Sequence, residues 1–206
     1  LRILKFKDWE VLPYDPISPY PELITERVKT LLNLYLNTFD LLLISPLALC
    51  HLIPPKEFIE QNVFDYKIND AITTNELIER LINAGYVRTD QVYEHGEFSV
   101  RGSLLDFFPS GSSLPFRINI HQNSIESIRT FDPDTQRTVY KVNKVEVIPA
   151  REFPTNKDGI KKFRQNYRNY FSGDPTRSYI YTSVTEGINP NGIEYYIPLF
   201  FDECNT

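Results

Sequence analysis

The spacing of apolar residues changes near the middle of this 206-residue chain, and this change constrains the fold more than any other feature of the sequence. From residue 73 to residue 85 apolar residues recur every three or four positions, which is typical of a helix. From residue 97 to residue 147 they recur at close to every second position, in short runs separated by turn sequences at 109–113, 121–123 and 132–134. Short strands joined by short turns form an antiparallel meander. We therefore predict an α+β segment with one helix and a small antiparallel sheet, whose strands carry Phe98, Val100, Phe116, Ile118, Ile120, Ile125, Ile128, Val139, Val142, Val145 and Val147.

The predicted helix of this segment has clear start and stop signals. Thr73 and Glu76 have the spacing of a capping box, in which each side chain accepts a hydrogen bond from the backbone N–H of the other residue. Gly85 is expected to end the helix, because glycine readily adopts the left-handed conformation found just after a helix. The buried stripe of this helix is expected to comprise Leu77, Ile78, Leu81 and Ile82.

The first 55 residues have an α/β pattern. Residues 3–6 are a strand candidate, and the apolar run at 41–44 is of the kind that is buried on both faces of a parallel sheet. A helix between them is expected to begin at Ser18, whose hydroxyl suits an N-cap before Pro19, and to place its apolar positions between residues 23 and 35. Strand, helix and strand in this order are one turn of a nucleotide-binding-type sheet, so we expect a partial domain of that class.

The last segment, from residue 149 onward, contains the one basic stretch of the chain. Thr155 is expected to cap a helix there, with Asp158 at the reciprocal position. Residues 149–178 carry seven basic and three acidic residues, so their net charge is +4. A solvated helix face explains this charge, and contact with the phosphate backbone of a nucleic acid is the alternative. The apolar face of this helix is expected to comprise Ile160, Phe163, Tyr167 and Phe171.

Composition excludes several classes of protein. The chain has 27 Phe and Tyr residues and 41% apolar residues, too many for a disordered chain. Its longest apolar runs are far shorter than the ~20 residues that span a membrane, and no signal peptide is recognisable. A net charge of -5 argues against general electrostatic binding of DNA. Cys50 and Cys204 have no metal-binding spacing, so we expect reduced thiols and a cytoplasmic location. The chain has no methionine and begins with Leu1, and we therefore expect a piece of a longer protein.

Motifs for catalysis and metal binding are missing from the sequence. It contains no G-x-x-x-x-G-K-[ST] phosphate loop, no G-x-S-x-G and no H-E-x-x-H. The three histidines, His51, His95 and His121, lack the spacing of metal ligands. Asp202 and Glu203 follow an apolar run, as metal-binding carboxylates follow a strand in ATPases, but Pro198 argues against a central strand there. We therefore expect no catalytic residue, no metal site and no cofactor in this segment.

Two arginines in the predicted strands stand out. Side chains alternate along a strand, so Phe116, Ile118 and Ile120 share one face of the predicted strand. Arg117 and His121 then lie together on the opposite face. By the same reasoning Arg101 lies opposite Phe98. These arginines fit either ordinary surface ion pairs or a docking face, since arginine is enriched among the residues that anchor interfaces.

Six stretches of the sequence, in order, resemble the N-terminal part of bacterial transcription-repair coupling factors (the Mfd family). They are residues 8–15 (Asp-Trp-Glu-Val-Leu-Pro-Tyr-Asp), 85–102, 105–109 (Leu-Asp-Phe-Phe-Pro), 129–137, 149–154 and 192–201. The same region resembles the damage-recognition protein UvrB, which shares an R-G-x-x-x-D-x-F-P core. The stretches at 131–137 and 151–154 favour the Mfd family over UvrB.

The resemblance implies a fold and a division into domains. Members of the family begin with a module that is similar to UvrB but has lost a working ATP site. The implied fold is a partial RecA-like (P-loop-like) parallel-sheet domain with an inserted small antiparallel-sheet domain. The implied domains are residues 1–55 as part of domain 1A, 56–148 as domain 2, and 149–206 as the start of domain 1B.

The resemblance also implies partners and a site. In the family, domain 2 docks onto UvrA through the arginine of a V-R-G stretch and an arginine early in a following strand, which match Arg101 and Arg117. A third contact, usually aromatic, aligns with His121, where this sequence departs from the family. A histidine can still stack on a partner and donate a hydrogen bond. The implied UvrA-binding residues are therefore Arg101, Arg117 and His121.

The implied function is transcription-coupled DNA repair by recruitment of UvrA to stalled RNA polymerase. The full-length protein is expected to be an ATP-dependent DNA translocase that uses ATP and Mg, and to contact RNA polymerase and double-stranded DNA through regions outside this segment. The segment alone is expected to have no enzymatic activity. The alternative is a UvrB-like ATPase that recognises damage in nucleotide excision repair. An autoinhibitory contact with the rest of the protein is a further role that the resemblance allows for the exposed face.

Overall fold

The chain divides into two compact units in the computed structural model, which describes residues 1–204. The first unit comprises Leu1–Glu60 together with the residues from Glu152 onward, and the second comprises Gln61–Arg151. The second unit is thus inserted into the first along the sequence. None of the helices in residues 1–204 has the length and apolar content that crossing a bilayer requires.

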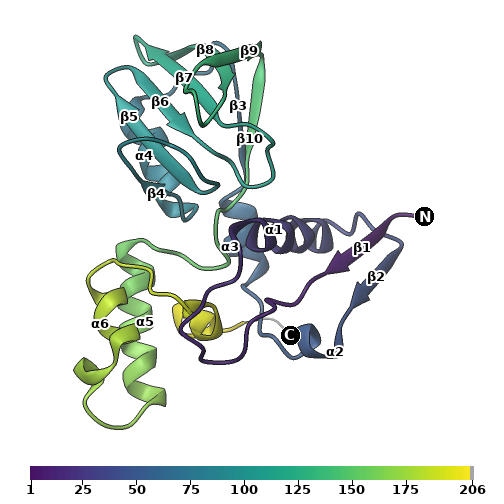
Figure 1. The fold of residues 1–206 in the computed structure, drawn as a ribbon, viewed down its shortest axis with the longest axis vertical. Coiled ribbons are helices and arrows are strands. Elements are labelled where there is room, and N and C mark those ends of the chain that lie inside the picture. Colours follow the sequence, from purple (N-terminus) through teal and green to yellow (C-terminus); the bar gives the residue numbers. More distant parts are fainter. Residues whose placement is uncertain (205–206) are drawn as a thin grey trace. The chain divides into compact units, whose positions relative to one another are not determined.

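The first unit begins with a two-stranded parallel sheet. Strands β1 (Ile3–Phe6) and β2 (Leu41–Ile44) pair over their whole length, as predicted, and α1 (Pro21–Tyr35) connects them (Figure 1). Phe6, Leu31 and three other buried side chains form the core against this sheet. The prediction that β2 is buried on both faces is wrong, because Leu41 and Leu43 point away from this core and are 43% and 46% exposed.

The start of α1 differs from the prediction. The helix begins at Pro21 after Tyr20, which makes no side-chain capping bond, so Ser18 is not its N-cap. The Ser18 hydroxyl instead donates a hydrogen bond to Glu194 Oε2 (2.9 Å) and accepts one from the backbone N–H of Gly192 (3.0 Å). A contact between residues so distant in the sequence outcompetes the local cap.

Short helices complete the first unit. They are α2 (Pro46–Leu49), α3 (Lys56–Gln61), α5 (Lys157–Tyr170), α6 (Tyr179–Thr185) and the 3-10 helices η1 (Pro175–Arg177) and η2 (Ile193–Phe200). Helix α5 is capped by Asn156, whose side chain accepts from the N–H of Gly159, so the prediction of Thr155 as the cap is wrong by one residue. The apolar run before Asp202 is helical in η2, which confirms that these carboxylates do not follow a central strand.

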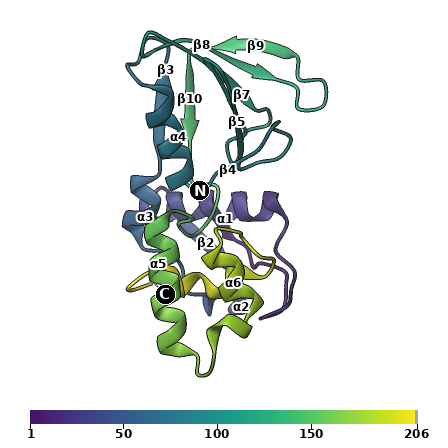
Figure 2. The same cartoon turned by 90° about the vertical axis from the view of Figure 1, so that its left-hand side faces the viewer.

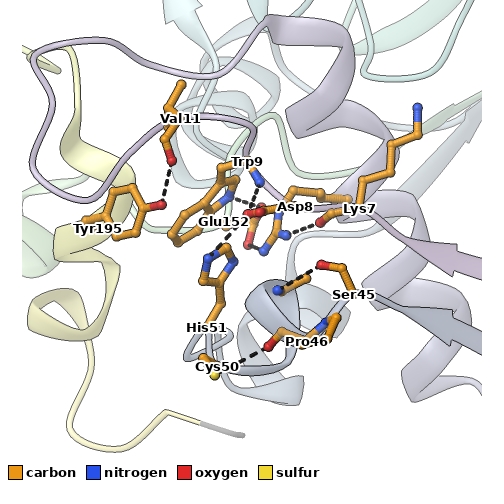
Figure 3. Close-up of polar contacts among 12 residues, drawn as sticks. Lys7, Asp8, Trp9, Val11, Ser45, Pro46, Cys50, His51, Glu152 and Tyr195 are labelled. Carbon is orange, nitrogen blue, oxygen red and sulfur yellow. Dashed lines mark hydrogen bonds and ion pairs between the residues drawn. The ribbon is translucent and has the colours of Figure 1, made fainter.

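A buried ion pair lies at the centre of the first unit. Glu152 accepts two hydrogen bonds from Arg27, at 2.6 and 3.1 Å, and one from the indole of Trp9 at 3.3 Å (Figure 3). The Arg27 guanidinium also lies over the rings of Phe6 and Trp9. His51 stacks on Trp9 with ring centroids 4.1 Å apart, and its Nε2 is 3.4 Å from a carboxylate oxygen of Asp8. These groups hold the N-terminal segment against the chain where it returns from the insertion.

The second unit is built on a six-stranded sheet with the order β4-β5-β6-β7-β8-β9 (Figure 1; a second view is in Figure 2). The strands are β4 (Val87–Arg88), β5 (Glu97–Arg101), β6 (Leu104–Phe107), β7 (Phe116–His121), β8 (Ser124–Phe131) and β9 (Thr138–Val142). The neighbours from β5 to β9 pair antiparallel, which confirms the meander, whereas β4 pairs parallel to β5. The prediction that Val145 and Val147 belong to this sheet is wrong. Their strand β10 (Lys144–Val147) pairs instead with β3 (Phe64–Lys67), in a separate two-stranded sheet.

Helix α4 (Thr74–Asn83) covers one face of the six-stranded sheet. Its capping box between Thr73 and Glu76 is present with both hydrogen bonds, at 2.8 and 3.2 Å, as predicted. Gly85 follows the helix with a φ of 85°, which confirms its role at the helix end. The side chains that α4 and the sheet bury between them include Leu77, Leu81, Phe98, Leu105, Phe107, Ile118 and Ile120. The opposite face of the sheet is therefore the one on which polar side chains gather.

Candidate functional site

A row of polar side chains crosses five strands on the face of the sheet that points away from α4. Strand pairing places Ser99 of β5 opposite Asp106 of β6, Asp106 opposite Arg117 of β7, and Arg117 opposite Arg129 of β8. Lys141 of β9 continues the row beside Arg129. Residues directly opposite one another in neighbouring strands have side chains on the same face. We refer to this face, with Arg101 and His121 at its margins, as the arginine face.

Asp106 is the centre of the arginine face. Its side chain is only 2% exposed and accepts three hydrogen bonds from guanidinium groups. Two come from Arg117, through Nε at 2.7 Å and Nη2 at 2.8 Å, and one comes from Arg101 Nη2 at 2.9 Å. A buried carboxylate requires such partners, because an unpaired charge in the interior is very unfavourable. The structure thus brings together the two arginines that the sequence singled out, and it does so through Asp106, the aspartate of the R-G-x-x-x-D-x-F-P core, to which the sequence alone assigned no role in the site.

Arg117 is held on three sides. Beyond its two bonds to Asp106, its Cζ lies 4.7 Å from the ring centroid of Phe131, and its Nη1 donates to the carbonyl oxygen of Gln136 at 3.4 Å. The side chain is 19% exposed. Hydrogen bonding to the Asp106 carboxylate raises the pKa of Arg117, although partial burial opposes this shift. The guanidinium is therefore a fixed positive charge whose orientation is set before any partner arrives.

Arg101 is the more accessible of the two arginines. Its side chain is 53% exposed, and a single hydrogen bond ties it to Asp106. A guanidinium has five N–H donors, so most of its donors are open to another molecule. Arg101 is therefore readily accessible to a partner, whereas Arg117 is mostly buried beside Asp106.

His121 lies at the end of β7 and is exposed. It belongs to the same side of β7 as Arg117, as alternation predicted, because the bulge in this hairpin falls on β8 and leaves β7 regular. Among residues 1–204 no hydrogen bond or ion pair joins His121 to either arginine. Asn119, between them, donates to a carboxylate oxygen of Glu126. The face thus extends from the arginines to His121 across a polar surface.

Several polar atoms on and beside the arginine face lack partners within the described part of the chain. They are Ser99 Oγ, Asn119 Oδ1, Arg129 Nε and Gln136 Oε1, all buried from solvent. In addition, the cations Arg117, Arg129 and Lys141 are direct neighbours in the row, and like charges directly opposite in a sheet destabilise it. Asp106 alone is an acidic member of this row. The face therefore has an excess of positive charge, which an acidic partner would neutralise.

The other histidines and the two cysteines lie outside the arginine face. Across residues 1–204, no group of three or more His, Cys, Asp or Glu side chains could hold a metal ion. His95 is engaged with the carbonyl oxygen of Ser112 at 2.8 Å and packs against Phe108. Cys50 and Cys204 are both free thiols, and burial raises the pKa of Cys204 to about 11.

A signal for Asp106 was available in the sequence. The residue lies in the short run Leu104–Phe107, where apolar side chains surround it on both sides. A carboxylate in such a strand needs a cation on a neighbouring strand. Arg101 and Arg117 were the strand arginines predicted to lie on the face opposite the apolar residues, so they were the candidates for this cation. Arg129 and Lys141 could not be placed in the row from the sequence, because that needs the register of β8 and β9.

Comparisons with known proteins identify the family of this chain. A protein-family model described as the UvrB interaction domain matches residues 64–153, which include the whole arginine face. The transcription-repair-coupling factor of Haemophilus influenzae (strain ATCC 51907 / DSM 11121 / KW20 / Rd) is 41% identical over 203 residues, 98% of this chain and 18% of that protein. The one of Escherichia coli (strain K12) is 39% identical over 201 residues, again 98% and 18%. The one of Rickettsia conorii (strain ATCC VR-613 / Malish 7) is 32% identical over 208 residues, 100% and 18%.

The chain thus spans about a fifth of the length of the curated relatives it matches. The match covers nearly all of its own residues, and these relatives carry the name that the six sequence stretches indicated rather than that of UvrB. The chain belongs to the transcription-repair coupling factor family, as a segment that contains the UvrB interaction domain.

Proposed function

We propose that this segment is a non-catalytic docking module that recruits UvrA during transcription-coupled repair, and that the arginine face is its contact surface. The observation that carries the proposal is Asp106, which is buried and orients both Arg101 and Arg117 on the exposed side of the sheet. A side chain that is fixed before binding loses little entropy when the partner docks. The match to a UvrB interaction domain supports a repair protein as the partner.

The charge of the face indicates the chemistry of the partner surface. Arg117, Arg129 and Lys141 are neighbours in one row, and Arg101 is open at its margin. A partner that places carboxylates over this row gains charge-assisted hydrogen bonds and removes the repulsion between the cations. We therefore propose that an acidic patch on UvrA meets the arginine face.

The division into domains follows from the same proposal. We infer that residues 1–55 are part of a UvrB-like domain 1A and that the parallel pair β1 and β2 is the remnant of a RecA-like sheet. Residues 56–148 are then the UvrA-docking domain 2, and residues 149–206 the start of domain 1B. We also propose that this segment holds no nucleotide or magnesium ion; the sequence lacks the phosphate loop, and no group of metal-binding side chains lies among residues 1–204. ATP hydrolysis, DNA translocation and contact with RNA polymerase are proposed for the rest of the full-length protein.

The decisive experiment is a titration of the chain with UvrA, measured by calorimetry. Arg101→Ala is the cleaner variant, because this side chain is half exposed and makes one bond within the chain. We expect it to weaken binding by on the order of 2 kcal/mol, which is about a 30-fold loss of affinity. Arg117→Ala is expected to weaken binding at least as much, since it also releases Asp106. Replacing His121 with phenylalanine, the kind of residue the family carries there, is expected to preserve or strengthen binding.

Controls separate docking from folding. Lys67→Ala removes an exposed cation from β3, outside the arginine face, and is expected to leave the affinity unchanged. Thermal melting of each variant shows whether the unit is folded at the temperature of the titration. If folded Arg101→Ala and Arg117→Ala both bind UvrA as tightly as the unchanged chain, the arginine face is not the contact surface. If the unchanged chain does not bind at all, the recruitment function itself is wrong.

A further inference from the structure

Helix α5 carries a stripe of basic side chains on its outer face. Lys157, Lys161, Arg164 and Arg168 are spaced by four, three and four residues, so they lie along one side of the helix. Phe163 and Tyr167, on the other side, are buried in the core of the first unit. Eleven residues separate the ends of the stripe, which corresponds to roughly 16 Å along the helix axis.

These cations are not neutralised within the described chain. No ion pair of residues 1–204 involves any of the four, whereas the neighbouring Lys162 lies off the stripe and pairs with Asp202. A shallow depression of about 350 Å³ lies on the stripe. Only cationic and amide side chains line it: Lys161, Arg164, Gln165, Arg168 and Asn169. The surface therefore offers donors and positive charge without a single carboxylate.

Tyr181 of α6 holds two of the cations in place. Arg164 Nε donates to the Tyr181 hydroxyl at 3.4 Å, and Arg168 Cζ lies 5.6 Å from the centroid of the same ring. Burial raises the pKa of the Tyr181 hydroxyl, but hydrogen bonds and charge from Arg164 and Arg168 outweigh it and leave the pKa below its usual value. Two guanidinium groups of the stripe thus lie beside one tyrosine and concentrate positive charge there.

We propose that the basic stripe on α5 binds the phosphate backbone of double-stranded DNA. A duplex carries one negative charge per ~1.7 Å of its axis, so a line of four cations over roughly 16 Å meets a continuous series of phosphates. Amide groups such as Gln165 and Asn169 add hydrogen bonds to phosphate oxygens and read no base sequence. The chain as a whole has a net charge of -5, so we expect the contact to be confined to this stripe. Because the stripe contacts phosphates rather than bases, we expect binding to be independent of DNA sequence. This site is separate from the arginine face and does not depend on the recruitment of UvrA.

The test is fluorescence anisotropy of a labelled 20-base-pair duplex titrated with the full 206-residue chain. Four phosphate contacts predict a slope of about -3.6 in a plot of log affinity against log salt, which is roughly a 100-fold loss between 50 and 200 mM salt. The triple variant K161A, R164A, R168A is expected to bind at least tenfold more weakly at 50 mM salt, with a slope near -1. Circular dichroism of the triple variant checks that α5 remains helical.

A matched control and a second ligand make the result decisive. Lys67→Ala with Arg88→Ala removes two exposed cations from the second unit and is expected to change the affinity less than twofold. If the folded triple variant binds DNA within twofold of the unchanged chain, or if the affinity does not depend on salt, the proposal is overturned. Vesicles that contain anionic phospholipid are the comparison polyanion, and binding to them without binding to DNA would also overturn it.

Discussion

Asp106 and Arg117 lie directly opposite one another in strands β6 and β7 and share two hydrogen bonds of 2.7 and 2.8 Å. The pair has one buried member and one partly exposed member, so it connects the interior of the sheet to its outer surface. Arg101 joins the same carboxylate from the next strand. Three strands are thereby tied together on the face opposite α4, and the same contacts orient the cations that we propose for docking.

Replacing Asp106 with alanine is expected to destabilise the second unit by about 2 kcal/mol. The substitution leaves Arg117 partly buried without its carboxylate, and removing one member of a buried pair costs more than the pair contributes. Urea unfolding followed by circular dichroism measures the change. Asp134→Ala, on an exposed turn of the same unit, is the matched control and is expected to stay within about 0.5 kcal/mol. Equal stability of both variants would show that Asp106 has no structural role.

The pair of Arg27 and Glu152 is expected to behave as a unit in a double-mutant cycle. Both side chains are buried, at 0% and 2% exposure, so Arg27→Met alone or Glu152→Leu alone is expected to cost about 3–5 kcal/mol. The double variant is expected to cost clearly less than the sum, because neither charge is then left unpaired. The exposed pair of Lys56 and Glu60 provides the comparison, with an expected coupling of about 0.3–0.5 kcal/mol. Additive effects at Arg27 and Glu152 would contradict the prediction.

The stability of the first unit is expected to fall as the pH drops below about 6.5. Burial lowers the pKa of His51, and the charge of Arg27 lowers it further, against the opposing effect of Asp8 and Glu152. The unfolded chain therefore takes up a proton at this histidine before the folded chain does, so the free energy of unfolding decreases with decreasing pH in this window. Above the window the imidazole is neutral in both states and its contribution is complete.

The measurement for His51 is urea unfolding at about pH 7.5 and about pH 5.5. His51→Phe keeps a ring to stack on Trp9 and is expected to reduce the loss of stability between the two pH values. His121→Phe is the control, because this histidine is exposed and its replacement should leave the loss unchanged. A loss of the same size in the unchanged chain and in His51→Phe would exclude His51 as the titrating group.

Two glycines with nearly the same backbone conformation are expected to respond differently to alanine. Gly187 and Gly192 have φ values of 79° and 82°, so both variants pay for a left-handed alanine, about 1 kcal/mol. A Cβ on Gly187 would meet open space, whereas one on Gly192 would lie 2.2 Å from the carbonyl oxygen of Asp15. Gly192→Ala is therefore expected to lower the melting temperature far more than Gly187→Ala. Similar melting temperatures would show that the segment around Asp15 yields easily.

The features that the sequence predicted correctly are local ones. The capping box of Thr73 and Glu76 involves residues three apart, and the alternation that places Arg117 and His121 on one side of β7 needs only that strand. Both are determined by the covalent geometry of a short segment, so neighbouring sequence is sufficient to predict them.

The features that the sequence missed depend on partners far along the chain. Ser18 binds residues 192 and 194 rather than capping α1, and β10 pairs with β3 across the whole insertion. Asp106 is functionally interesting only once two arginines of other strands are known to reach it. Local propensity cannot decide between such contacts and the local alternatives, because the energies involved are similar and the geometry is set by the complete fold.

The hydrogen bonds of Ser18 to residues beyond the insertion have a consequence for how the molecule is made. The first unit cannot close until the chain has been synthesised past Glu194, whereas all of Gln61–Arg151 is continuous and available much earlier. We expect the inserted unit to fold first on the ribosome. Residues 1–60 are expected to remain unfolded until the residues from Glu152 onward, with which they pack, have been synthesised. Protease treatment of nascent chains stalled before Glu194 would then cut residues 1–60 and spare the sheet, and the reverse pattern would refute this order. Residues 1–60 are translated before the inserted unit but, on this view, acquire their structure after it.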